Sequence, residues 1–184
     1  LKRKLLLDFS LGKQEFPRQF GWHLVLNSRD PSPSPTHHPS PSTFFIKTLN
    51  LTSVSYLTNQ TVSSLVSNFH SLESLTITKC NGLRSLRIDD VSNLQNLTIL
   101  DCPQLKSLYI EAYELTSFRY RGLLCWFSLR GLHFLADAML DFREGPGYSR
   151  FEYQHFDLLL LAMRNVKILT LCRWIFEAII SPWL

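Results

Sequence analysis

The sequence lacks the short motifs that mark catalytic and metal-binding sites. It has no glycine loop for a phosphate, no GxSxG, no HExxH and no CxxC pair. The apolar run in its opening, LKRKLLLDFSLG, is far too short to span a membrane. We therefore expect that the chain is not an enzyme, binds no cofactor or metal and does not enter a membrane.

A strong charge of one sign is missing as well. The net charge is +4, and the excess lies partly at residues 2–4 and partly at Arg119 and Arg121. Proteins that bind nucleic acid more often carry a continuous basic stripe with exposed aromatic side chains. We therefore expect no nucleic-acid partner.

The carboxylates and histidines do not form a convincing catalytic group. Asp89 and Asp90 are adjacent on a predicted strand, which is typical of a solvated edge. His133 and Asp137 are four residues apart, but their segment has the pattern of a strand and a loop. Asp141 falls at a predicted strand end, where a structural role is expected.

A repeat is the main feature that the sequence does contain. Five segments between residues 72 and 120 share the frame Lxx(L/F)x(I/Y). Their fourth and sixth residues are apolar and alternate with polar ones, which predicts short strands with one buried face. The segments begin at Leu72, Leu83, Leu94, Leu105 and Leu115. The residues predicted to point inward are Leu75 and Ile77, Leu86 and Ile88, Leu97 and Ile99, Leu108 and Ile110, and Phe118 and Tyr120.

The segments alternate in kind, so one coil spans two of them. Cys80 and Cys102 follow the first and third segments, 22 residues apart. LxxLxIxxC fits the leucine-rich repeat pattern, whose length covers this spacing. The fold class predicted is α/β, a leucine-rich repeat solenoid with a curved parallel sheet and a convex side of mixed helix, strand and loop. The two cysteines should lie on adjacent coils, either bridged or, as we favour, as small buried thiols.

The chain divides into three regions. Residues 1–28 form an N-terminal segment with possible strands at 5–9 and 16–26, which we expect to pack on the solenoid. Residues 29–43 are rich in proline and serine and are predicted to be a disordered loop. Residues 44–184 form the repeat domain. Because the chain begins with Leu1 and ends without a polar cap, we expect it to be a fragment.

Within the repeat domain the pattern predicts both helices and strands. A helix is predicted at 59–69, with Asn59 or Thr61 as its cap, and a second helix at 155–163. Back strands are predicted at 83–88 and 105–110, and further strands at 126–129 and 136–142. The segment 166–171 repeats the frame, with Val166, Leu169 and Leu171 inward.

The outward residues of the front strands are the predicted binding site. They form two rows on the concave face. Arginine suits a partner carboxylate or phosphate, whereas exposed threonine is also simply good strand material. One row holds Asn50, Thr76, Thr98 and Arg119, and the other holds Thr52, Thr78, Leu100 and Arg121. The back-strand residues Arg87, Asp89, Tyr109 and Glu111 serve as a negative control.

Several stretches together resemble the leucine-rich region of plant F-box proteins: LESLTITKCNGLRSLRI, LTSFRYRG, LADAMLDF and NVKILTLCRWIFEAI. The resemblance implies substrate capture by the repeats of a cullin ubiquitin ligase, in the cytoplasm or nucleus. It implies a Skp-type adaptor only if an F-box lies upstream of Leu1, since these 184 residues contain none. The alternatives are a stand-alone repeat scaffold and a receptor ectodomain fragment glycosylated at Asn50, Asn59 and Asn96.

Overall fold

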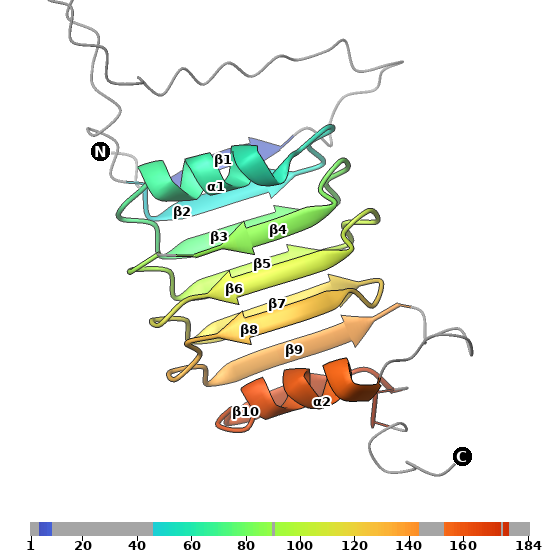
Figure 1. The fold of residues 1–184 in the computed structure, drawn as a ribbon. Helices are drawn as coiled ribbons and strands as arrows, with labels where there is room; N and C mark the ends of the chain where they lie inside the picture. The colour runs from blue at the N-terminus through green and yellow to red at the C-terminus, as the bar shows by residue number, and fades with distance from the viewer. Residues whose placement is uncertain (1–3, 9–45, 90, 144–152, 174, 177–184) are drawn as a thin grey trace, which may run out of the picture.

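The computed structural model describes residues 4–8, 46–89, 91–143, 153–173 and 175–176. The strand predicted at 16–26 and the proline-serine loop at 29–43 lie outside these ranges. In the described part of the chain, the strands form two parallel sheets that face each other across one core (Figure 1).

Within the described ranges, the front sheet has seven strands and the back sheet has three. The front sheet has the order β1 (Lys4–Asp8), β2 (Thr48–Thr52), β3 (Ser74–Thr78), β5 (Asn96–Leu100), β7 (Ser117–Gly122), β9 (Asp137–Phe142) and β10 (Ile168–Leu171). The back sheet has the order β4 (Ser85–Ile88), β6 (Ser107–Glu111) and β8 (Trp126–Arg130). Alternation between the sheets along the chain confirms the predicted coil with a strand on each side.

The inward positions of the repeat frame form the core. All ten residues predicted to point inward between positions 75 and 120 are buried. Each buried leucine or isoleucine contributes roughly 1.5–3 kcal/mol of hydrophobic free energy, most of which is offset by ordering the backbone. Because the leucines of one coil pack on those of the next, the coils stabilise one another rather than folding alone.

A left-handed turn ends three successive front strands. Ser53, Lys79 and Asp101 have φ angles of 55°, 53° and 54°. The N–H of each of these residues donates to a carbonyl at the end of the next front strand, as in the 2.8 Å bond from Lys79 to Leu100. The hydrogen bond offsets the strain that a side chain normally meets at positive φ. These turns lead the chain from the front sheet to the back.

The two helices α1 (Asn59–Asn68) and α2 (Tyr153–Ala162) both lie on the side of the back sheet (Figure 1). The helix predicted at 59–69 is confirmed, but its predicted cap is wrong. Thr58 is the N-cap, because its Oγ1 accepts the backbone N–H of Thr61 at 3.2 Å. The helix predicted at 155–163 corresponds to α2.

The last repeat is less buried than its pattern predicts. β10 pairs with β9, and Leu169 aligns with the buried Ala138. Leu169 is nevertheless 40% exposed, and Val166 and Leu171 are only partly buried. The predicted burial is therefore wrong for Leu169. Among the described strands, β10 is the outermost of the sheet and has a neighbouring strand on one side only.

Aromatic side chains join the leucines of the core after β6. The ring of Tyr120 lies 5.1 Å from Phe127 and 5.6 Å from Phe142, centroid to centroid. The buried Tyr120 hydroxyl donates a 2.5 Å hydrogen bond to the carbonyl of Leu123. Burial raises the pKa of Tyr120 above its ordinary value, so the hydroxyl stays a donor.

Candidate functional site

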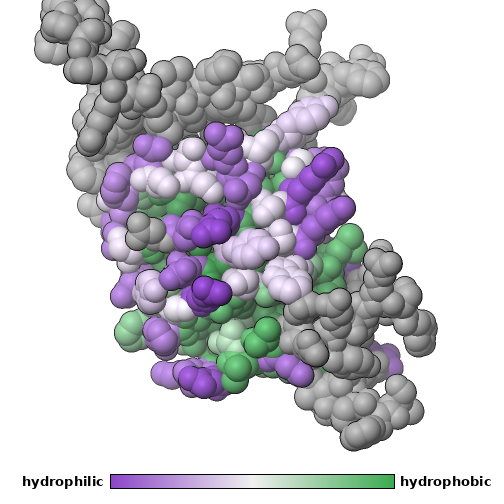
Figure 2. Space-filling model, in the orientation of Figure 1, coloured by the Kyte–Doolittle hydropathy of each residue, from purple (hydrophilic) through white to green (hydrophobic). Residues whose placement is uncertain are grey.

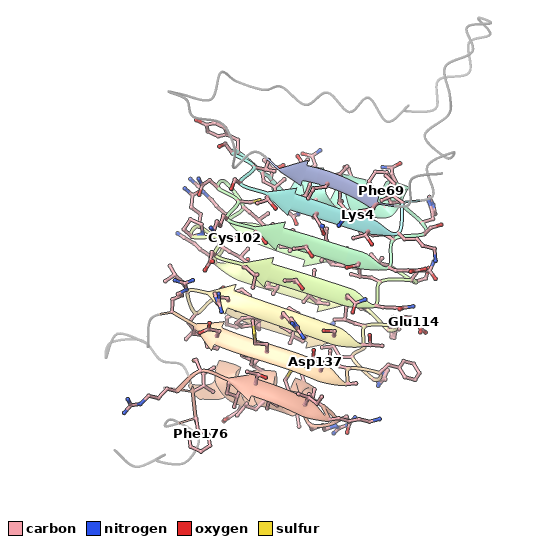
Figure 3. The ribbon with its side chains drawn as sticks, turned by 180° about the vertical axis from the view of Figure 1, so that it is seen from behind. Lys4, Phe69, Cys102, Glu114, Asp137 and Phe176 are labelled. Atoms are coloured by element: carbon pink, nitrogen blue, oxygen red, sulfur yellow. The ribbon has the colours of Figure 1, made fainter. Side chains whose placement is uncertain are left out.

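In the part of the chain that the structure describes, no helix or strand lies over the outer face of the front sheet. Figure 3 looks onto this face, and the helices lie behind the sheet. The space-filling view in Figure 2 shows the opposite face, with the helices and the back sheet. Among the described helices and strands, none covers the front face, so its outward side chains are available to a partner.

The strand register brings the predicted residues into two rows. Asn50 pairs with Thr76, Thr76 with Thr98, and Thr98 with Arg119. The second row is aligned in the same way, through Thr52, Thr78, Leu100 and Arg121. The predicted alignment is thus confirmed, while the role of these residues in binding remains a prediction.

A third row on the same face was missed. It begins each front strand and includes Lys4 at one end of the sheet and Asp137 near the other (Figure 3). Ser74, Asn96 and Ser117 lie between them and pair across neighbouring strands. The signal was present in the frame, because these residues precede the first inward residue of their strand by one position.

The two arginines of the predicted site have partners within the chain. Arg119 Nη2 lies 3.0 Å from Asp137 Oδ2, and Arg121 Nε lies 2.7 Å from Asp141 Oδ2. Each pair joins β7 to β9, so the charges alternate across the face instead of forming a basic patch. The residues of each pair are 18 and 20 residues apart in sequence, which is close to the length of one coil. This spacing is the feature of the sequence that could have predicted the two ion pairs.

Further ion pairs lie where the front strands begin and end. Lys47 pairs with Glu73 before β2 and β3, and Arg143 Nη2 lies 2.9 Å from Asp101 Oδ1 after β9 and β5. All of these side chains are partly exposed, and exposed ion pairs stabilise a protein by only about 0–1 kcal/mol. A partner with its own carboxylates can therefore compete for these arginines at little cost to the fold.

The four cysteines are free thiols, and the expected role of Cys80 and Cys102 as small buried thiols is confirmed. Cys80 Sγ lies 3.4 Å from the carbonyl of Thr78, and Cys102 Sγ lies 3.6 Å from that of Leu100. Burial raises the pKa of Cys102 to about 12 and also raises that of Cys80. These thiols fill the core and are poor nucleophiles.

The residues chosen as a control line a groove on the opposite sheet. Arg87, Asp89, Tyr109 and Glu111 surround a cavity of about 220 Å³ on the outer face of β4, β6 and β8. The Arg87 guanidinium lies 2.8 Å from Asp89 Oδ2, and this pair raises the pKa of Arg87.

No metal site appears among the described residues, since none of their His, Cys, Asp and Glu side chains gather in groups of three or more. Within the same ranges, no helix is long and apolar enough to cross a membrane.

Comparison with known protein families gives a match over most of the chain. A family model described as the leucine-rich repeat domain of At1g61320/AtMIF1 matches residues 34–179. None of the curated proteins and none of the solved structures matches the chain. The match covers most of the 184 residues and supports a plant leucine-rich repeat protein, a class of domain that generally binds protein partners and is typically not enzymatic. With its alternating sheets and buried leucines, the chain is a protein-interaction module that belongs to the At1g61320/AtMIF1 leucine-rich repeat domain family.

Proposed function

We propose that the chain recognises protein substrates for a plant ubiquitin ligase of the F-box type, through the open face of its front sheet. The observation that carries the proposal is the alignment of three polar rows on a face that no described element covers. Hydroxyl and amide groups line most of these rows, and the charged residues gather toward β7 and β9. The resemblance to plant F-box proteins supplies the ligase setting.

The arginines give this surface a way to bind acidic partners. Arg119 and Arg121 are exposed enough to exchange Asp137 and Asp141 for carboxylates or phosphates of a substrate. Guanidinium groups bind such anions through paired hydrogen bonds. The exchange replaces one ion pair by another, so it discriminates between partners more than it adds to affinity.

Reversal of these two charges tests the binding surface. The Arg119→Glu and Arg121→Glu double variant should lose the proteins that the wild-type chain captures from plant extract, while its circular dichroism spectrum stays unchanged. Arg87→Glu is the matched control, because Arg87 is also exposed and paired with an aspartate but lies on the other sheet. Equal capture by all three proteins would refute the front-face site.

Co-purification tests the ligase setting separately. The full-length protein should bring down a Skp-type adaptor from plant cells. If it does not, the ligase role is withdrawn, and a stand-alone repeat scaffold that uses the same face becomes the better proposal.

A further inference from the structure

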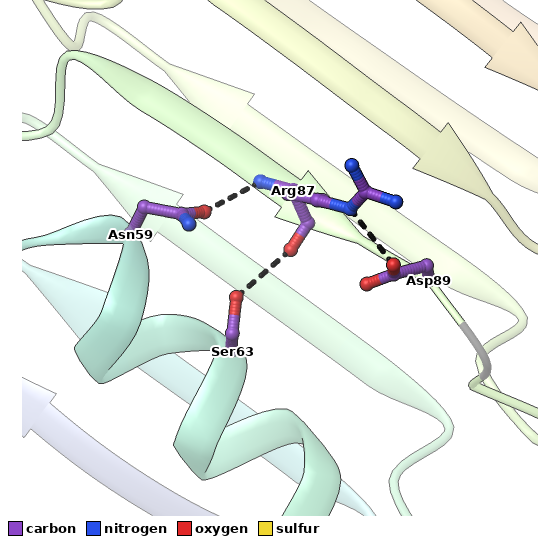
Figure 4. A network of polar contacts seen from close by, with 4 residues as sticks. All are labelled: Asn59, Ser63, Arg87 and Asp89. Carbon is purple, nitrogen blue, oxygen red and sulfur yellow. Dashed lines mark hydrogen bonds and ion pairs between the residues drawn. The ribbon is translucent and has the colours of Figure 1, made fainter.

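Each outer edge of the back sheet lies against a helix. α1 packs beside β4, and α2 packs beside β8. At the first edge, the N–H of Arg87 donates a 2.7 Å hydrogen bond to Asn59 Oδ1, and Ser63 Oγ donates a 3.1 Å hydrogen bond to the carbonyl of Arg87 (Figure 4). Two side chains of α1 therefore satisfy the outward backbone groups at the middle of β4.

α2 covers the other edge with apolar side chains. Its Leu159 and the following Met163 are buried in the core. Among the described residues, none forms a hydrogen bond with the backbone groups of Phe127 and Leu129 that point away from β6. The helix nevertheless occupies the space beside β8, so a further strand can pair at neither edge. The part of this sheet that the described elements leave accessible is its outer face, between the two helices (Figure 1).

Two cavities on this face join into one groove. The cavity of about 220 Å³ described above and a second of about 560 Å³ between β8 and α2 are both lined by Ser128 and Arg130. Ser128 is the smallest outward side chain of β8, and it aligns with Tyr109 of β6. Residues of α2 form one wall of this β8 groove, and Tyr109 forms the other. The groove follows β8, whose five residues span about 17 Å.

Large apolar side chains line the β8 groove. Trp126 of β8 is 44% exposed, and Tyr109 of β6 is 39% exposed. Leu158 and Leu161 of α2 are 59% and 57% exposed, and they lie on the same side of the helix because they are three residues apart. In Figure 2, hydrophobic side chains gather over the lower part of this face, where α2 lies. Tryptophan and tyrosine are among the residues that contribute most to binding at protein interfaces, so the groove has the composition of an interface centre.

One end of the β8 groove carries positive charge. Arg130 ends β8, and Arg164 follows α2. Arg130 aligns with Glu111 of β6, but Glu111 accepts the hydroxyl of Tyr113 at 2.8 Å. Among the described residues, neither arginine has an ion-pair partner, and no acidic side chain lines the larger cavity. Carboxylates of a bound partner would therefore meet these arginines without displacing a carboxylate of this chain.

We propose that the β8 groove binds an amphipathic helix of a partner protein. The apolar stripe of that helix packs on Trp126, Leu158 and Leu161, and its Asp or Glu residues pair with the two arginines. A helix suits this surface because its backbone hydrogen bonds are internal, whereas an extended segment would need an open sheet edge. Three helical turns span about 16 Å, which matches the groove. The proposal does not rest on substrate capture by the front sheet, which lies on the opposite side of the core.

Selection from a defined peptide library tests the proposal. The probe is a phage-displayed library of randomised peptides of about fourteen residues, or four helical turns. It is selected on the whole chain and depleted on Ser128→Trp, whose indole fills the groove. Ser74→Trp is the matched control, because Ser74 is also half-buried and faces outward but lies on the front sheet. We expect enriched peptides that bind Ser74→Trp like the wild type and carry apolar residues three and four apart, beside Asp or Glu.

Affinities of the best peptide give a second readout, by fluorescence anisotropy of its fluorescein-labelled form. Ser128→Trp and the Arg130→Glu and Arg164→Glu double variant should each bind it at least about tenfold more weakly, whereas Arg119→Glu on the front sheet should bind it like the wild type. A proline in the middle of the peptide should cause a similar loss, because proline breaks a helix.

The helix and its place on the back sheet can each be refuted. Absence of enriched peptides that depend on Ser128, apolar residues at alternate positions in those peptides, or unchanged binding after the charge reversals or the proline substitution would each overturn the proposal. Dimers of the free chain that dissociate on Ser128→Trp would also overturn it, because the occupant would then be a second copy. The front-face variants leave this groove intact, so failure of one proposal does not decide the other.

Discussion

The two ends of the back sheet are built from the same parts and differ in one respect. Each end places a ten-residue helix beside an edge strand, α1 beside β4 and α2 beside β8. Asn59 and Ser63 of α1 satisfy both backbone groups of Arg87. At the other end, Phe127 and Leu129 have no such partners in the described chain. A helix can therefore cover a sheet edge without closing it.

The difference follows from the composition of the two helices. α1 reads NQTVSSLVSN, and its residues 59 and 63, one turn apart, fall on the same side of the helix. α2 reads YQHFDLLLLA, and its leucines cannot accept or donate a hydrogen bond. Polar side chains at helical spacing close an edge, whereas apolar ones at the same place leave a cavity.

The largest effect on stability should come from substitution of Gly82, which packs against the backbone of Tyr56 in the turn before α1. Gly82 has a φ of +89°, and a Cβ there would lie 2.7 Å from Cα of Tyr56. Backbone cannot move aside cheaply, so we expect Gly82→Ala to lower the free energy of unfolding by about 3 kcal/mol.

Gly131 is the matched position toward the other end. Its φ is +70°, but an added Cβ would meet the exposed ring of Tyr113, which can rotate away. Gly131→Ala should therefore cost only about 1 kcal/mol. Urea denaturation followed by circular dichroism compares the two variants, and equal losses would contradict the argument.

A pH dependence should reveal the buried thiol of Cys102. Burial raises the pKa of Cys102 from 9.0 to about 12. Between these values the unfolded chain loses the proton and the folded chain keeps it, so stability is lost as pH rises from 9. The slope for one thiol is about 1.4 kcal/mol per pH unit.

The Cys102→Ala variant isolates that contribution. Its stability should fall less steeply above pH 9 than that of the wild type, although the smaller side chain lowers its stability at pH 7. Differential scanning calorimetry across this range gives both curves. Parallel curves would show that the Cys102 thiol titrates alike in the folded and unfolded chain.

Removal of the two hydrogen bonds from α1 to Arg87 should have a smaller effect on stability. It should also make the β4 edge of the back sheet resemble the β8 edge. Asn59→Ala and Ser63→Ala each leave a backbone group of Arg87 without its partner, at a cost of about 1 kcal/mol. The amide hydrogen of Arg87 should also exchange faster in Asn59→Ala. Gln60→Ala is the control, because Gln60 is exposed on the same helix turn. Unchanged exchange in Asn59→Ala would mean that the edge is protected in another way.

The smallest effects on stability should come from the ion pairs of the front sheet, which are alike at the two ends of that sheet. Lys47 and Glu73 lie near one end, and Arg121 and Asp141 near the other. All four side chains are over a third exposed, so double-mutant cycles should give coupling energies of about 0.5 kcal/mol that fall with salt. A coupling well above 1 kcal/mol at either end would show that the front face has an asymmetry of its own.

Much of the fold follows from spacing along the chain. The frame from Leu72 to Tyr120 fixes which residues point inward, because a strand alternates and a coil repeats after about 22 residues. The same spacing aligned Asn50, Thr76 and Thr98 correctly across three strands. Local periodicity suffices wherever each coil meets only its neighbours.

Three features of the structure were not fixed by the frame, which gives the spacing of residues but not their side-chain contacts. Thr58 caps α1, Asp137 and Asp141 pair with the arginines of β7, and Leu169 is exposed despite its inward position. Each of these features depends on side-chain geometry or on what lies beyond a strand. The repeat spacing of the sequence determines neither of the two.

By itself, then, the sequence determined the repeat, its core and the register of the front rows, because hydrophobic burial at a fixed spacing leaves one way to stack the coils. The tertiary structure decided how each sheet ends. Whether an edge such as β4 or β8 is closed depends on which side chains a distant helix brings within hydrogen-bonding distance, and that distance exists only in the folded chain.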